Sequence, residues 1–315
     1  MKDSSHALRG WLALLGAIFL FSTIEIASKE LHDQVPTVNS MVVVFLRFFI
    51  TGVALIGLSW RRIRRELRLG AKDYGLFALN GIIGISVGIT LFHVAIVMMD
   101  KAASAAVVFS SNPVFVTLLA PFINREKWTA VKIGGVLLGA VGVTFFAWES
   151  GTPEVSSVQG LEVMLLSAFC FALSICISKR IMPRYGATVV MGFSAMFGSL
   201  FLLPFIAFRL PISCFTSLAP AWPTVLYLAV IGTTVAYGLY YYGIHNTSAQ
   251  GGSMSFFLKP VLASILAIFI RGETINGYMS AGTFLILLGL FLAEIVPKLW
   301  ASQKPARIQE PVSDG

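Results

Sequence analysis

Three ionisable side chains lie well inside long apolar runs of the sequence: Glu25, Arg47 and Lys259. A charge at the centre of a bilayer is costly, so such residues usually face a cavity or a partner of opposite charge. Glu25 could exchange protons or contact a solute in a transport cycle. It could equally form a structural ion pair with Arg47 or Lys259, and the sequence leaves both roles open.

The two cations also have alternative roles. Arg47 could bind a substrate carboxylate through two parallel hydrogen bonds, or it could anchor its helix. Lys259 precedes Pro260, as Asn112 precedes Pro113. Proline lacks a backbone donor and interrupts a helix, and such breaks can expose polar backbone to a binding cavity. An amide facing an ammonium would suit an anionic or zwitterionic solute; a kink that serves packing alone is the alternative.

A histidine and two tyrosines complete the candidate substrate-binding or coupling residues. His93 is expected toward the outer end of the third helix, and Tyr241 is its approximate counterpart in the second half. Tyr237 lies one turn before Tyr241. These rings could line a cavity and stack on a substrate, or they could face lipid in an aromatic belt. The sequence predicts no catalytic residue, no metal site and no cofactor, and it leaves proton coupling through Glu25 open.

One motif resembles a catalytic one. Gly84, Ser86 and Gly88 fit the pattern G-x-S-x-G of a nucleophile elbow, which requires a strand, a sharp turn and then a helix. Here the motif lies in an apolar run without a nearby Asp or Glu. The same spacing is typical of close helix packing, as is that of Gly135 and Gly139. We therefore predict that the protein is not an enzyme.

The elements that must position these residues are membrane helices. Hydrophobic residues make up 57% of the 315 residues and charged residues only 12%, and the mean hydropathy is +0.82. Lipid explains this composition, and backbone groups in lipid must be satisfied within helices. We predict an all-α integral membrane protein with ten transmembrane helices. The expected spans are 10–29, 38–60, 74–98, 102–123, 129–148, 160–181, 187–208, 221–245, 249–271 and 277–297.

The distribution of positive charge predicts the orientation. The formal net charge is +8, and six of the basic residues crowd the segment 61–72 between two apolar runs, as in a cytoplasmic membrane loop. Nucleic-acid binding is therefore not expected. With the N-terminus in the cytoplasm, 17 of the 23 Lys and Arg residues lie inside and four outside. This asymmetry predicts that both termini are cytoplasmic.

The two halves of the sequence are related. The segment 113–126 matches 260–273 at a constant offset of 147, with seven of fourteen positions identical, and Ser28–Lys29 and Ser178–Lys179 end the first helix of each half. Each unit holds five spans, and because five is odd the second copy must be inverted. We expect one repeat in 1–149, another in 150–299 and a disordered cytoplasmic tail in 300–315. Inverted repeats are characteristic of secondary transporters.

These features resemble the drug/metabolite transporter superfamily, in its bacterial EamA-type branch. The resemblance rests on Leu46-Arg47-Phe48, on the Asn112-Pro113 and Lys259-Pro260 steps, on Glu126 and Glu273, and on the five-plus-five layout. It implies a carrier of the inner membrane without an ATPase, often an exporter of amino acids or related metabolites. It also implies a central cavity lined by helices 1–4 and 6–9. Where many relatives carry Trp-Gly, this chain has Phe21-Ser22.

The function predicted is secondary active transport of a small polar metabolite by alternating access. The alternatives are a membrane-embedded enzyme acting on lipid intermediates, which would want a cluster of His, Asp or Ser at one interface, and a scaffold subunit that does not transport. The partners expected are a small solute and the lipid bilayer, and the sequence leaves a monomer and a homodimer open.

Overall fold

The structure is a computed structural model that describes residues 2–124, 130–147, 155–246, 258–272, 274–294 and 296. Within these ranges some side chains are not described, among them those of Pro113, Tyr241 and Pro260. The predicted tail 300–315 and the residues Glu126 and Glu273 lie outside the described residues. All regular secondary structure in the described part of the chain is helical.

Seven helical stretches in the described part of the chain are long and apolar enough to cross a membrane. They are Leu8–Gln34, Ser40–Glu66, Ala71–Met98, Ser104–Ile123, Val158–Tyr185, Ala187–Arg209 and Ser213–Tyr240. Two shorter apolar helices follow, Val261–Arg271 and Gly277–Gly289. The prediction of an all-helical membrane protein is therefore confirmed.

The first repeat begins with two helices, α1 (Lys2–Ser22) and α2 (Ile24–Gln34), that meet at Thr23. The sequence predicted one uninterrupted span here. Next come α3 (Ser40–Glu66), α4 (Ala71–Gly81), the π-helical segment η1 (Ile82–Ile89) and α5 (Thr90–Met98). The last helices are α6 (Ala102–Phe109), α7 (Asn112–Asn124) and α8 (Ala130–Ala147).

The second repeat begins with one continuous helix, α9 (Val155–Tyr185), followed by α10 (Ala187–Arg209). Short pieces α11 (Ser213–Thr216), η2 (Ala219–Ala221) and α12 (Trp222–Leu226) lead into the π-helical segment η3 (Tyr227–Val235) and α13 (Ala236–Asn246). The described part ends with α15 (Leu258–Arg271) and α16 (Gly277–Glu294). A π-helical stretch thus occurs in the third helix of each repeat, and such stretches are frequent at functional sites.

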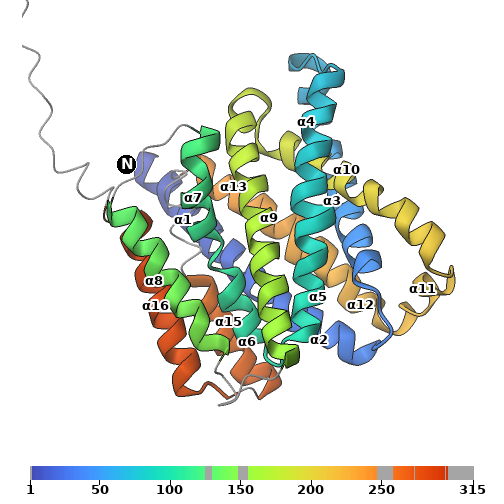
Figure 1. Cartoon of the computed structure of the whole chain (residues 1–315). Helices are drawn as coiled ribbons and strands as arrows, with labels where there is room; N and C mark the ends of the chain where they lie inside the picture. The colour runs from blue at the N-terminus through green and yellow to red at the C-terminus, as the bar shows by residue number, and fades with distance from the viewer. Residues whose placement is uncertain are drawn as a thin grey trace, which may run out of the picture.

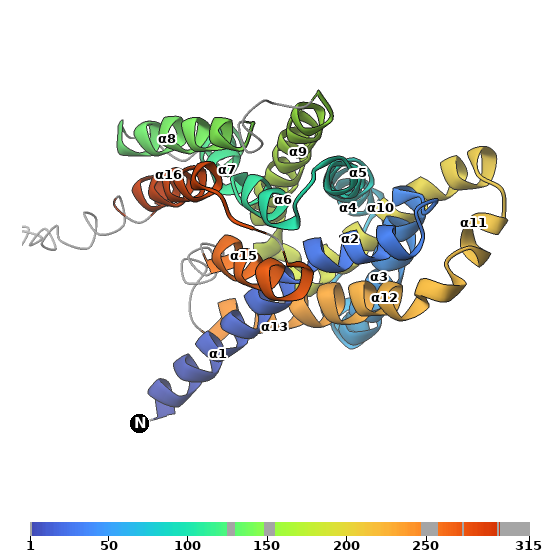
Figure 2. The same cartoon turned by 90° about the horizontal axis from the view of Figure 1, so that it is seen from below.

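The helices of the two repeats exchange equivalent packing partners. Helix α1 packs on α13 and α15, while α9 packs on α5 and α7. In the same way α3 contacts η3 and α10 contacts η1. Two equivalent pairs contact each other directly: α3 with α10, and α8 with α16. Figures 1 and 2 show α8 and α16 side by side at the edge of the bundle.

Glycines make the α8–α16 contact close. A Cβ atom added at Gly289 would lie 2.4 Å from the carbonyl oxygen of Gly135 and 2.7 Å from the backbone nitrogen of Gly139. A Cβ at Gly142 would lie 2.8 Å from the backbone nitrogen of Ile286. Gly135 and Gly139 therefore lie in a close helix contact, as predicted from their spacing.

Candidate functional site

A buried ion pair joins the two repeats in the middle of the bundle. Lys259 Nζ on α15 donates to Glu25 Oε1 on α2 at 2.6 Å, and the two side chains are 5% and 0% exposed. The ammonium also lies 5.1 Å from the centre of the Phe109 ring. Of the partners considered for Glu25, Lys259 is thus the one in direct contact.

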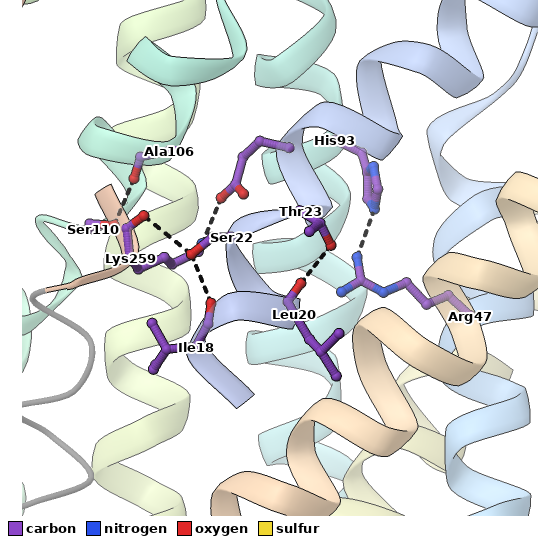
Figure 3. Close-up of polar contacts among 10 residues, drawn as sticks. Ile18, Leu20, Ser22, Thr23, Arg47, His93, Ala106, Ser110 and Lys259 are labelled. Atoms are coloured by element: carbon purple, nitrogen blue, oxygen red, sulfur yellow. Dashed lines mark hydrogen bonds and ion pairs between the residues drawn. The ribbon is translucent and has the colours of Figure 1, made fainter. Parts of the chain in front are cut away.

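The chain is irregular on both sides of this pair. Helix α1 ends at Ser22, whose hydroxyl donates to the carbonyl of Ile18 at 2.7 Å and to that of Lys259 at 3.2 Å (Figure 3). Across the pair, Ser110 and Ser111 separate α6 from α7 just before Asn112-Pro113. Ser110 Oγ donates to the Ala106 carbonyl at 2.7 Å. At both breaks a serine hydroxyl therefore satisfies a carbonyl one turn back in its own helix, and Ser22 also reaches the Lys259 backbone.

Arg47 forms a second buried contact between the repeats. Its Nε donates to Thr233 Oγ1 in η3, and its Nη1 lies 3.3 Å from His93 Nε2 on α5 (Figure 3). Because a guanidinium can only donate, His93 Nε2 must be the acceptor, which requires a neutral imidazole. Thr51 Oγ1, one turn along α3, lies 3.0 Å from Thr234 Oγ1. Arg47 is therefore held by groups from both repeats.

The other predicted site residues lie around these two contacts. The Tyr237 ring packs edge-on against Phe21, with ring centres 5.0 Å apart, and both Tyr237 and Glu25 are close enough to interact electrostatically with Arg47. Tyr241 lies in α13, and Pro113 and Pro260 lie in the first turns of α7 and α15.

Asn112, the counterpart of Lys259, makes a neutral contact. Its Nδ2 donates to the carbonyl of Ala168 on α9 at 2.9 Å. Aligning Ser28–Lys29 with Ser178–Lys179 places Ile175 at the position equivalent to Glu25. The α7–α9 interface therefore repeats the packing of α15 on α1 and α2, with neutral residues at the positions equivalent to Glu25 and Lys259.

Sequence reasoning missed a second polar cluster. Asn80 on α4 donates to Ser178 Oγ at 3.0 Å and to Ser194 Oγ at 2.9 Å, and it accepts from Ser174 Oγ at 3.0 Å. In the other half Tyr227 occupies the position equivalent to Asn80, and its hydroxyl lies 2.6 Å from Thr23 Oγ1. The sequence feature that could have indicated this cluster is Asn80, a polar residue within an apolar run.

Ion pairs and a cavity occupy the lower end of the molecule in Figure 1, where α2, α5 and α15 finish. Arg271 Nη1 lies 2.9 Å from Asp33 Oδ2 and 3.9 Å from Glu30 Oε2. Lys29 Nζ donates to the carbonyls of Met99 and Asp100. A cavity of about 260 Å³ lies among these groups, lined by Lys29, His32, Asp33, Ile96, Val97, Met99, Asp100 and Arg271. At the upper end Arg180 Nη1 donates to the Ile123 carbonyl at 3.1 Å.

The G-x-S-x-G residues serve packing. Gly84 and Gly88 lie in η1 against α9, where a Cβ at Gly84 would lie 2.3 Å from Ser174 Oγ. The Ser86 hydroxyl donates to the Gly198 carbonyl on α10 at 2.6 Å. Among the described residues, no group of three or more His, Cys, Asp and Glu side chains could hold a metal ion.

Comparison with known proteins identifies a family match over nearly the whole chain. The model of the EamA-like transporter family matches twice, over residues 8–148 and 159–295. An uncharacterized transporter of Clostridium kluyveri is 30% identical over 287 residues, which cover 89% of this chain and 91% of that protein. A solved crystal structure with 21% identity covers 94% of this chain and 99% of its own, with a TM-score of 0.63, and this likeness concerns the fold alone.

Two relatives from Salmonella typhimurium have more specific names. The uncharacterized inner membrane transporter YicL is 23% identical over 294 residues, covering 91% of this chain and 95% of that protein. A probable amino-acid metabolite efflux pump is 25% identical over 293 residues, covering 90% of this chain and 93% of that protein. Both match along most of their length, so the comparison concerns whole proteins.

Proposed function

Since the chain belongs to the EamA-like transporter family, and is therefore a membrane transporter and not an enzyme, we propose that it moves a small polar metabolite by alternating access. The solute is an amino acid or a related compound, and the direction is export across a bacterial inner membrane. The observation that carries the proposal is the buried Glu25–Lys259 pair. It joins one repeat to the other at the interface where inverted-repeat transporters bind solute.

The proposal includes ten spans in two inverted five-helix repeats, with domain limits at 1–149 and 150–299 and both termini in the cytoplasm. It is supported by the two family matches and by the exchange of packing partners between the halves. It is further supported by antiparallel first helices: α1 descends in Figure 1, whereas α9 ascends. Helices α8 and α16, each 18 residues long, are the peripheral fifth helix of each repeat.

In this proposal the solute binds at the ion pair. A solute carrying a carboxylate competes with Glu25 for the Lys259 ammonium, and one carrying an ammonium competes with Lys259 for Glu25. Either exchange replaces a contact between the repeats with contacts to the solute, which favours their relative movement. Proton uptake by Glu25 would release Lys259 in the same way, so Glu25 is a candidate for both binding and coupling.

The first experiment identifies the solute and then measures its flux. Purified protein is screened against metabolites by thermal shift, because a compound that binds only the folded state raises its apparent stability. Uptake of a radiolabelled hit into proteoliposomes is then measured for Glu25→Gln and Lys259→Met. We expect saturable flux of an unmodified solute in the wild type and loss of that flux in both variants.

Matched controls separate the site from general effects of charge. Glu162 and Lys72 are exposed to the surroundings of the bundle, so Glu162→Gln and Lys72→Met remove the same charges elsewhere and should transport at the wild-type rate. Wild-type flux in Glu25→Gln and Lys259→Met would refute the assignment of the site. A chemically altered solute, or no flux of any solute that binds, would contradict the proposed transport.

A further inference from the structure

Three buried polar atoms without a hydrogen-bond partner in the described part of the chain follow one another along α2. They are Glu25 Oε2, Ser28 Oγ and His32 Nδ1. Glu25 is 0% exposed and Ser28 is 5% exposed. A buried polar group that lacks a protein partner is costly, and in folded proteins such a group usually binds ordered water.

The spacing of these residues places them on one face of the helix. Intervals of three and then four residues bring side chains above one another. At 1.5 Å per residue, Glu25 and His32 are about 10 Å apart along the axis, a distance that a few water molecules can bridge by way of Ser28. A fourth atom of the same kind, Thr90 Oγ1, lies on α5, which packs against α2.

One end of this row opens into solvent and the other ends at the ion pair. His32 lines the cavity of about 260 Å³ at the lower end of the molecule. Glu25 uses only Oε1 in its contact with Lys259, so Oε2 is the carboxylate oxygen left without a hydrogen-bond partner. The row therefore links the cavity to the group whose charge holds the repeats together.

We propose that the α2 face formed by Glu25, Ser28 and His32 is a water-lined proton path from the lower-end cavity to the ion pair. The inference rests on the proposed role of Glu25 in transport. The His32 imidazole takes up a proton from the cavity and releases one from Nδ1, which passes through water bound at Ser28 Oγ and reaches Glu25 Oε2. The carboxylate becomes a neutral carboxylic acid, Lys259 keeps its charge, and water is the sole co-reactant.

The charged groups at each end of the path decide when a proton moves. Those that line the cavity with His32 are Lys29 and Asp33 on α2, Asp100 between α5 and α6, and Arg271 on α15. Those around Glu25 are Lys259 on α15, with Arg47 on α3 and Tyr237 on α13 nearby. Glu25 contacts Lys259 directly, so a proton that reaches its carboxylate removes the charge on which that contact depends.

The path is tested by thiol accessibility in the full-length protein, after Cys170, Cys176 and Cys214 are replaced by Ser. Ser28→Cys is nearly isosteric, and Ile26→Cys is the matched control because Ile26 is also 5% exposed but lies on another face of α2. A charged methanethiosulfonate needs a hydrated thiolate. We expect Ser28→Cys to react at least roughly tenfold faster, because each pK unit by which apolar surroundings disfavour a thiolate lowers its fraction tenfold.

Variants of His32, at the cavity end of the path, and a second measurement complete the test. His32→Phe should slow the labelling of Ser28→Cys, whereas His32→Gln should not. In protein with native side chains, a pH jump followed by infrared spectroscopy should show a carboxylic acid band that Glu25→Gln lacks. Its appearance should be slower in Ser28→Val and unchanged in Ile26→Val.

The outcomes separate this inference from the proposed function. The path is overturned if Ser28→Cys and Ile26→Cys are labelled at equal rates. It is also overturned if the carboxylic acid band appears at the same rate in Ser28→Val as in the protein with native side chains. If the path fails while Glu25→Gln still abolishes solute flux, the transport site stands alone. If Glu25→Gln transports at the wild-type rate, the proposed transport site is wrong, whatever the result of the labelling.

Discussion

The Glu25–Lys259 pair combines a structural contact with a candidate transport site, and the two roles can be separated by mutation. Removing one partner leaves the other as an uncompensated buried charge, which is strongly destabilising, whereas replacing both with neutral groups of similar size is often tolerated. The two side chains are 5% and 0% exposed, so solvent does not screen the charge that is left unpaired.

We predict that Lys259→Met lowers the free energy of unfolding by roughly 3 kcal/mol, and that adding Glu25→Gln restores most of this loss. Solute flux should stay absent in the double variant. Thermal unfolding in detergent measures the first effect and proteoliposome uptake the second. Recovery of flux together with stability would mean that the pair is only a structural anchor.

At the scale of elements, the α8–α16 contact depends on the absence of side chains. A Cβ at Gly289 would lie 2.4 Å from the Gly135 carbonyl oxygen, a distance that requires the helices to move apart. Gly134, on the same helix as Gly135, has nothing within 4 Å of an added Cβ. One helix pair thus provides both a sensitive position and a matched control.

We predict that Gly289→Ala destabilises the protein by about 1–3 kcal/mol through overpacking. Gly134→Ala should be neutral or slightly stabilising, because alanine is the better helix former. Melting temperatures of the two variants in detergent check this expectation. Equal melting temperatures would contradict the close approach of α8 and α16.

Much of this element-level structure was predictable from the sequence, because lipid requires long apolar helices and the repeat fixes their grouping. The spans containing Glu25 and Arg47 were predicted to begin within two residues of their observed starts, but to end five and six residues too early. The break at Thr23 was not, because Phe21-Ser22-Thr23 contains no Pro or Gly. The π-helical segments η1 and η3 were also missed; η1 packs against α10 and η3 against α3, contacts that the local sequence does not reveal.

The site was less predictable than the fold. Charge inside a span was enough to single out Glu25 and Lys259, and their contact was one of two alternatives considered. Thr233, Ser28 and His32 were missed, since hydroxyl residues are common in membrane helices and His32 lies at the edge of its span. Reading the intervals of three and four residues from Glu25 onward would have indicated the shared face.

On the scale of the whole molecule, alternating access requires the two ends to open in turn. At the lower end Arg271 on α15 is bridged to Asp33 and Glu30 on α2. At the upper end Arg180 on α9 donates to a carbonyl of α7. These contacts join equivalent helices of the two repeats, so the proposed alternating access requires opening at each end to break one of them.

We predict that locking the lower contact stops transport. In a background without the three native cysteines, Asp33→Cys and Arg271→Cys are joined by a short, cleavable bifunctional thiol reagent. Solute flux in proteoliposomes should be lost after crosslinking and return after reduction. Each single cysteine variant treated alike should keep its flux, and full flux in the crosslinked protein would contradict movement of α2 relative to α15.

The neutral Asn112–Ala168 contact on one side and the charged Glu25–Lys259 contact on the other have an energetic consequence. Two identical halves would give inward- and outward-facing conformations of equal free energy. Of these two equivalent contacts, only Glu25–Lys259 carries ionised groups, and a membrane voltage acts on charge, by about 2.3 kcal/mol per elementary charge per 100 mV moved across the full bilayer. The electrical potential of the cell should therefore bias which way this carrier faces at rest.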